Sequence, residues 1–457
     1  MSDSRHLVVI GAGYVGLVTA VGLGRLGHNV HLVETRADRL DALRAGRVPI
    51  HEAGLQEAFE SLVAADRLSV GDRLDGRFDA ALVCVGTPIG ADGRSDLSQL
   101  RTALAELTPA LSDGSPLVIR STLPPGSTTL AVEWADLSTS RIFTNPEFLR
   151  QGTALADFES PTRIVIGRFA DADPEALDLV VGLYDGIDAP RLVVDVASAE
   201  LIKNGANAFL ALKLSFTNEI ASLAEEYGAD VDDVLAGITL DPRIGSQYMR
   251  PSFGFGGSCL PKELQALAAA GAARGLSMHV TIAASDANTA QQARFANRIA
   301  EAVGGVEGRT IGLLGLAFKA GTDDVRDSPA LAVAARLLEE GARVCAYDPQ
   351  ASANALRVLP ALQIAETALD ALTGADAAVI GTEWPEFAAV DWSIARSRLA
   401  RPIVVDGRRL LDPAELRTLG YRYEAIGNPR ADGVAGAPPP TSDSGRQPKT
   451  QSAATTS

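Results

Sequence analysis

Short runs of branched aliphatic residues alternate with helical patterns in two separate parts of the chain. In the first part the runs lie at residues 6–10, 29–34, 79–85, 115–121, 163–167 and 191–196. Buried parallel strands have this composition and length, and the segments between them are long enough for crossover helices. The pattern therefore predicts an α/β fold built on a parallel sheet.

The pattern changes after residue 198, where proline is absent and apolar residues keep helical spacing to about residue 228. After about residue 304 the strand pattern restarts as a weak internal repeat. RTIGLLGLAF resembles HLVVIGAGYV, ARVCAYDP resembles NVHLVETR, DAAVIGTEWPEF resembles DAALVCVGTP, and RPIVVDGRRLLD resembles PLVIRSTLPPG. We expect two Rossmann-like domains, 1–197 and 304–430, joined by a long central helix within a helical middle domain, 198–303. Residues 431–457 are rich in Pro, Gly, Ser and Thr, a composition typical of disorder.

Composition narrows the classes of partner. The chain has 41 Lys and Arg against 57 Asp and Glu, a formal net charge of −16, which argues against binding nucleic acid or an anionic membrane. Its cysteines, Cys84, Cys259 and Cys345, lie far apart without metal-site spacing, which indicates a reducing compartment and no zinc. No signal peptide and no apolar run of membrane-spanning length are recognisable, so we expect a cytoplasmic protein.

A glycine motif follows the first predicted strand. Gly11, Gly13 and Gly16 form GxGxxG between a strand and a helix, where they permit a tight turn, close approach of a pyrophosphate and helix–strand packing. Glu34 ends the next strand, where a carboxylate binds ribose hydroxyls and repels a 2′-phosphate. NAD is therefore expected rather than NADP, although Arg36 and Arg39 follow closely. The corresponding turn of the second part lacks this spacing but carries Lys319 and Arg326, which suggests a different anionic ligand.

The segment SFGFGGSCLPKE (252–263) places a cysteine directly after a glycine run. Glycine suits a backbone that turns tightly or approaches a ligand closely. Cys259 could be a reactive thiol or a small buried residue. The buried role suits Cys84 and Cys345 better, because both lie in apolar strands.

Several motifs in the same order resemble the UDP-glucose/GDP-mannose 6-dehydrogenase family over roughly residues 5–425. They are GAGYVGL, CVGTP, STLPPG, NPEFLRQGTA, KNGANAFLALKLSFTNEIA, DPRIGSQYMRPSFGFGGSCLPKE, GLAFKAGTDDVRDSPA and VDGRRLLD. The resemblance implies oxidation of a sugar C6 alcohol to a carboxylate with two NAD and no metal. UDP-glucose is the best single substrate, and dTDP-glucose, GDP-mannose and UDP-N-acetylhexosamines stay open.

The resemblance also implies roles for individual residues. Cys259 captures the aldehyde as a thiohemiacetal and carries the later thioester. Lys203 and Asn207, four apart on one helix face, stabilise the developing oxyanion. Glu147 acts as a general base, and Thr122 positions a water or the substrate hydroxyl. Glu263 holds a water or tunes Lys203.

The family pattern also implies the binding sites and the assembly. The central helix pairs protomers in the family, so a homodimer at least is expected. Arg243 resembles an arginine that reaches the neighbouring subunit's sugar. The expected cofactor residues are Gly11, Gly13, Tyr14, Val15, Gly16, Glu34, Arg39, Val85, Gly86, Thr87, Pro88, Ser121, Thr122, Gln151 and Arg326. The expected nucleotide-sugar residues are Glu147, Phe148, Leu149, Arg150, Lys203, Asn207, Arg243, Arg250, Phe253, Gly254, Phe255, Gly256, Phe318, Lys319 and Arg408.

This chain departs from the family pattern at two positions. Glu263 stands where Asp is usual, and Gln151 where a second Glu is common. Both keep a polar function, so activity is expected to persist. Two other hypotheses fit the architecture: a hydroxy-acid dehydrogenase that needs no thiol, and a protein that binds NAD and a nucleotide-sugar without turnover.

Overall fold

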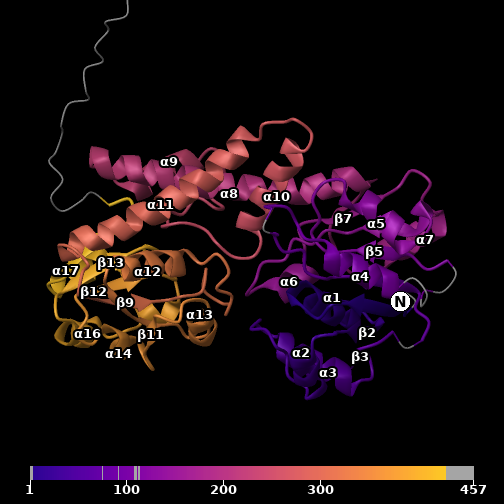
Figure 1. Ribbon diagram of the computed structural model, residues 1–457, viewed down its shortest axis with the longest axis horizontal. Helices are drawn as coiled ribbons and strands as arrows, with labels where there is room; N and C mark the ends of the chain where they lie inside the picture. The colour runs from indigo at the N-terminus through magenta and orange to yellow at the C-terminus, as the bar shows by residue number, and fades with distance from the viewer. Residues whose placement is uncertain (1–3, 75, 91, 108–110, 112–113, 429–457) are drawn as a thin grey trace, which may run out of the picture.

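The computed structural model describes residues 4–74, 76–90, 92–107, 111 and 114–428. Figure 1 shows two α/β bodies side by side, the first formed by the N-terminal part of the chain and the second by the C-terminal part. The long helix α8 (Val196–Tyr227) extends across both. The expected fold class, two Rossmann-like units with a long central helix, is confirmed. The predicted disorder of residues 431–457 concerns residues outside the described part of the chain.

The first sheet has the strand order β3-β2-β1-β4-β5-β6-β7-β8. Neighbouring strands are parallel except β6 and β7, which pair antiparallel. The strands are β1 (His6–Ile10), β2 (Asn29–Val33), β3 (Leu68–Gly71), β4 (Ala80–Val83), β5 (Leu117–Ile119), β6 (Ile142–Thr144), β7 (Ile164–Arg168) and β8 (Arg191–Asp195). The helices are α1 (Tyr14–Arg25), α2 (Ala37–Arg44), α3 (Leu55–Ala64), α4 (Ser98–Leu107), α5 (Ser127–Ala135), α6 (Ala154–Glu159) and α7 (Pro174–Gly182), with a short η2 (Thr139–Arg141).

The second sheet is parallel throughout, in the order β11-β10-β9-β12-β13-β14. The four repeated segments occupy matching places, because β10-β9-β12-β13 corresponds to β2-β1-β4-β5. Its strands are β9 (Thr310–Leu314), β10 (Arg343–Tyr347), β11 (Gln363–Ile364), β12 (Ala377–Ile380), β13 (Ile403–Asp406) and β14 (Arg422–Ala425). Its helices are α12 (Pro329–Glu339), α13 (Ser352–Val358), α14 (Ala368–Leu372), α15 (Pro385–Ala388), α16 (Trp392–Arg398) and α17 (Pro413–Thr418).

The middle of the chain is helical: α8 is followed by α9 (Val231–Thr239), α10 (Leu260–Ala272) and α11 (His279–Val303). Helix α8 begins two residues before the expected Ser198, because the side chain of Asp195 caps it by accepting from the Ser198 N–H. It continues through Asn204 and Gly205. The Asn204 amide donates to the Glu200 and Leu123 carbonyls, each at 2.8 Å, which fixes the helix against the first sheet.

One continuous hydrophobic core joins the middle helices to the second sheet. It contains Ala221 of α8, Phe295 and Ile299 of α11, and Ile311 of β9. Phe253 lies in the loop that leads to Cys259, residues 252–259, here called the cysteine loop. Its ring stacks on that of Phe295 with the ring centroids 4.6 Å apart. The cysteine loop is therefore held by the same core as the second sheet. Among the described helices, none is long and apolar enough to cross a membrane.

Candidate functional site

The glycine turn after β1 needs its glycines for steric reasons. Gly11 has φ +95°, and a Cβ there would lie 3.1 Å from the Cys84 carbonyl oxygen. A Cβ on Gly16 would lie 1.7 Å from the Gly11 oxygen, so Gly16 supports the turn from beneath. At Gly13 the first heavy atom near a Cβ is Arg39 Nη1, at 3.6 Å. The turn therefore leaves an open cradle at the N-terminus of α1, which suits a pyrophosphate.

Glu34 lies at the carboxyl end of β2, beside this turn. Its side chain is buried and accepts from the Ala12 N–H at 3.2 Å and the Arg36 N–H at 2.8 Å. Arg39 Nη1 stands 4.0 Å from Glu34 Oε2. A fixed carboxylate at this place fits the ribose hydroxyls of NAD, and the nearby cation explains why the charge can be buried.

A cavity of about 1470 Å³ starts at this turn and runs between the two α/β bodies. Fourteen of the fifteen expected cofactor residues line it, and Gly16 packs beneath it. The lining also includes four residues expected to act in catalysis, Thr122, Glu147, Cys259 and Glu263, and one expected to bind the nucleotide-sugar, Leu149. Because the strand order reverses between β1 and β4, this is the crevice in which Rossmann-type sheets bind their ligands.

A buried ion pair stands at the inner end of the cavity. Lys203 Nζ lies 3.2 Å from Glu147 Oε1, and their side chains are 4% and 5% exposed. Burial alone would raise the pKa of Glu147, but Lys203 and the Leu149 N–H lower it below its usual range. Burial would lower the pKa of Lys203, but Glu147, Glu263 and Cys259 raise it. The lysine is therefore a permanent cation close to the thiol.

Cys259 and Glu263 occupy the start of helix α10. Burial raises the pKa of the Cys259 thiol, and Lys203 opposes this by favouring the thiolate. Burial also raises the pKa of Glu263. The charges of Lys203 and Lys262 and the Asn207 amide oppose this shift only in part. Neither carboxylate oxygen of Glu263 has a hydrogen-bond partner at ordinary distance within the described residues. The Cys259 thiol is therefore subject to two opposing influences, burial that favours the neutral form and the Lys203 ammonium that favours the thiolate.

The glycine run before Cys259 is required by contact with the second α/β body. A Cβ on Gly256 would lie 2.0 Å from the Asp327 oxygen, and Gly257 has φ +85° beside the Phe318 ring. The Gly257 N–H also donates to the Arg326 carbonyl at 2.9 Å. Asn288 holds the loop from the other side, through both backbone groups of Phe255. A side chain at Gly256 or Gly257 would collide with the second α/β body, which explains why glycine precedes the cysteine.

The expected nucleotide-sugar residues are not all brought together. Lys203 and Asn207 do not line the cavity. Lys203 forms an ion pair with Glu147, which does line it. Arg243 pairs with Asp241, and its side chain is 87% exposed. Phe148 is covered by Arg163, whose Cζ lies 3.7 Å from the ring centroid. Arg150 pairs with Asp157 near the surface.

A second group of these residues gathers where the cysteine loop meets the second sheet. Arg408 donates to the Gly381 and Phe318 carbonyls, each at 3.0 Å, and stacks over the Phe253 ring at 4.9 Å. Arg250 donates to the Arg409 carbonyl at 2.8 Å. Burial lowers the pKa of Lys319, with Glu383 opposing the shift.

Three polar residues of the site were not anticipated from the sequence. Lys262 Nζ donates to Thr87 Oγ1 at 3.2 Å and lines the cavity, so it links α10 to the first sheet. Glu200 accepts from the Gly126 and Thr128 N–H groups and holds the loop that carries Thr122. Arg120 is buried and donates to Thr19 and Tyr184 at 2.9 and 3.0 Å. A charged residue at the end of the apolar run LVIR was the available signal for Arg120.

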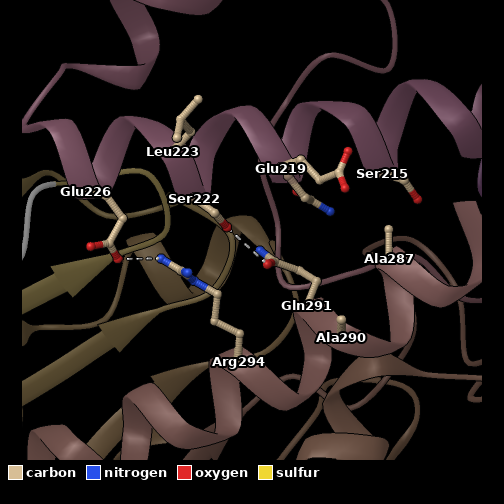
Figure 2. Close-up of a pocket in the computed structure, with 10 residues that line it drawn as sticks. Ser215, Glu219, Ser222, Leu223, Glu226, Ala287, Ala290, Gln291 and Arg294 are labelled. Atoms are coloured by element: carbon tan, nitrogen blue, oxygen red, sulfur yellow. Dashed lines mark hydrogen bonds and ion pairs between the residues drawn. The ribbon is translucent and has the colours of Figure 1, made fainter. Parts of the chain in front are cut away.

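A second, smaller hollow lies between α8 and α11, away from the cavity. Its volume is about 340 Å³, and Figure 2 shows Glu226 facing Arg294 and Ser222 facing Gln291 across it. Leu223 also lines it and is 54% exposed. The hollow is therefore lined by both polar pairs and by an apolar side chain, Leu223.

A Rossmann-type cavity that ends at a cysteine and a buried lysine–carboxylate pair defines a nicotinamide-dependent oxidoreductase. The NAD binding domain of the UDP-glucose/GDP-mannose dehydrogenase family matches residues 5–188, its central domain 197–290 and its UDP binding domain 312–413. The chain belongs to the UDP-glucose/GDP-mannose dehydrogenase family.

Individual relatives match nearly the whole chain. A UDP-glucose 6-dehydrogenase of Rhizobium meliloti is 38% identical and covers 93% of this chain and 99% of the relative. One of Pseudomonas aeruginosa is 38% identical, with coverage of 93% and 98%. Among solved structures, a UDP-glucose dehydrogenase of Pyrobaculum islandicum has a TM-score of 0.84 at 36% identity, covering 93% of this chain and 98% of that one. A UDP-D-ManNAc dehydrogenase of Pyrococcus horikoshii has a TM-score of 0.81 at 26% identity, with coverage of 92% and 99%.

Proposed function

We propose that this protein oxidises the C6 alcohol of UDP-glucose to the carboxylate of UDP-glucuronate, using NAD. The observation that carries the proposal is one cavity that runs from the glycine turn to Cys259 and the Lys203–Glu147 pair. The UDP-glucose 6-dehydrogenases of Rhizobium meliloti and Pseudomonas aeruginosa, each 38% identical, support this substrate.

If NAD is bound along the glycine turn, it would supply the acceptor for the hydride that leaves C6 in each of the two oxidation steps. The chain's own groups manage the carbon and the protons. In the first step the C6 hydroxyl loses its proton toward the Glu147 and Thr122 side of the cavity, and an aldehyde forms. The Cys259 sulfur then bonds to C6, and the thiol proton ends on the aldehyde oxygen, giving a thiohemiacetal.

Loss of a second hydride and a proton converts the thiohemiacetal to a thioester. Water then bonds to C6 and the carbon–sulfur bond breaks, which releases the carboxylate and restores the thiol. Lys203, with Asn207, stabilises the oxyanion at C6 through these steps. Glu147 takes the proton of the attacking water, and Glu263 supports Lys203 from the other side.

The sugar specificity is tested by initial rates of NADH formation with purified protein. UDP-glucose is expected to give the highest kcat/KM among UDP-glucose, dTDP-glucose, GDP-mannose and UDP-N-acetylglucosamine. A higher value with another sugar would replace the substrate and keep the chemistry. Absence of NADH with all four would contradict the proposed function.

We further propose a homodimer formed along α8. Four large apolar side chains lie exposed on one face of that helix at helical spacing, and Leu223 borders the hollow in Figure 2. They are Phe209, Phe216, Leu223 and Tyr227. Phe216→Glu is expected to yield monomers in light scattering, whereas an unchanged mass would contradict this interface.

A cytoplasmic location is supported by free thiols at all three cysteines.

A further inference from the structure

The loop between β9 and α12, residues 315–328, touches both other parts of the chain at the cavity. Its Arg326 carbonyl accepts from the Gly257 N–H of the cysteine loop at 2.9 Å. Its Gly321 carbonyl approaches Gly152 of the first α/β body so closely that a Cβ on Gly152 would lie 3.1 Å away. The loop therefore closes one side of the cavity.

Within the described residues, a side-chain hydrogen bond joins the two α/β bodies at this point. Gln151 Nε2 donates to Asp324 Oδ2 at 3.0 Å. The same carboxylate accepts from Arg326 Nε at 2.9 Å and Nη2 at 2.6 Å. Gln151, Asp324 and Arg326 all line the cavity, and the Asp324 side chain is only 9% exposed. The three residues form a continuous chain from the first body to the guanidinium of the second.

The hydrogen-bonded series Gln151–Asp324–Arg326 requires a neutral donor at position 151. Burial would raise the pKa of Asp324, but Arg326 and Gln151 lower it overall, so Asp324 is an ionised acceptor. A carboxamide can donate to it, whereas an ionised glutamate of the same length would place two carboxylates within about 3 Å of each other. The glutamine is therefore matched to Asp324 and not interchangeable with glutamate in this chain.

We propose that Gln151 is a positioning residue: it fastens the 315–328 loop across the cavity and so directs Arg326 toward the bound dinucleotide. The inference rests on the proposed function for the identity of that dinucleotide. The fastening itself depends only on the contact between Gln151 and Asp324, and it can be measured without turnover.

The test is a double-mutant cycle with Gln151→Glu, Asp324→Asn and the two combined, all confirmed as folded by thermal melting. The dissociation constant of NAD is measured by calorimetry without sugar, and the radius of gyration by small-angle scattering without any ligand. Gln151→Glu is expected to weaken NAD binding about tenfold or more, since a hydrogen bond to a charged group is lost. It should also increase the radius of gyration.

In the combined variant the donor and acceptor exchange places, because the carboxamide now at position 324 donates to the carboxylate now at position 151. Affinity and compactness should therefore return toward wild type.

Gln363→Glu on β11 provides the matched control, because it adds the same charge at an exposed position of the second sheet. It is expected to leave both measurements unchanged. Losses that simply add in the combined variant, or a Gln151→Glu variant as compact and as tight-binding as wild type, would overturn the proposal. If wild type bound no NAD, the proposed function would fail, and the scattering measurements would still decide whether Gln151 fastens the loop.

Discussion

Lys203 Nζ and Glu147 Oε1 form a buried ion pair at 3.2 Å, between helix α8 and the loop after β6. The pair sits where the cavity meets Cys259, and Lys203 is the largest factor that opposes the burial penalty on the thiolate. A buried pair of this kind costs desolvation free energy, so its presence at the end of a ligand cavity points to chemistry rather than to stability.

Removing one charge of this pair should harm folding and catalysis separately. Lys203→Met leaves Glu147 buried without its cation, and the free energy of unfolding should fall by about 3–5 kcal/mol. NADH formation should be abolished as well. The variant Lys203→Met/Glu147→Gln should recover most of the stability in denaturant titrations but none of the activity. Retained turnover in Lys203→Met would contradict the assigned role.

The buried acid beside Cys259 should limit stability at high pH. The pKa of Glu263 in the folded protein is raised above its ordinary value of 4.5, mainly by burial. Below that value both states are protonated; as pH rises, the unfolded state ionises first and the native state loses relative stability. Glu263→Gln should therefore raise Tm at pH 8, by at least about 2 °C, and leave it unchanged near pH 4.

The matched control for this effect is Glu133→Gln, since Glu133 is exposed on α5. Its Tm should match wild type at both pH values. A Glu263→Gln variant that is less stable than wild type at pH 8 would show that the carboxylate is favourable in the folded protein.

The glycine run should tolerate no side chain at its contact with the second α/β body. At Gly256 a Cβ would meet the Asp327 oxygen at 2.0 Å, so Gly256→Ala must displace the cysteine loop or residue 327. We expect loss of stability and a strong fall in kcat. Gly237→Ala on α9 is the control, because a Cβ there meets nothing within 4 Å, and helix propensity predicts a gain of about 0.5–1 kcal/mol. Equal behaviour of the two variants would contradict the steric argument.

Cofactor preference should depend on Glu34. Glu34→Ala removes the carboxylate beside the Ala12 N–H and leaves Arg36 and Arg39 nearby. The ratio of kcat/KM for NADP to that for NAD should rise by about tenfold or more. Asp41→Ala, at an exposed position of α2, should leave the ratio unchanged. An unchanged ratio in Glu34→Ala would assign the preference to other groups.

The strands were predictable because buried parallel strands are encoded locally by branched aliphatic runs. The repeated segments take matching positions in the two sheets, as expected from β1 and β9 with their following glycine turns. The antiparallel pairing of β6 with β7 was not predictable, since it depends on where the chain returns to the sheet. The two-residue error at the start of α8 has a local cause, the capping side chain of Asp195.

The site was predictable only in part. The residues of the glycine turn and their cavity follow from a contiguous motif, so spacing alone located them. Lys203 and Glu147 were named through resemblance, but their pairing joins residues 56 apart and needs the tertiary fold. The link from Lys262 to Thr87 and the contact of Gln151 with Asp324 likewise join distant segments, and no local pattern encodes them.

The central claim is the thioester cycle at Cys259, and counting NADH tests it most directly. With limiting UDP-glucose and excess NAD, wild type should form two NADH for each sugar consumed. Cys345→Ser, on β10 away from the cavity, should keep this ratio, and Cys259→Ser should lose the complete oxidation. A ratio of one for wild type, or a ratio of two in Cys259→Ser, would contradict the account.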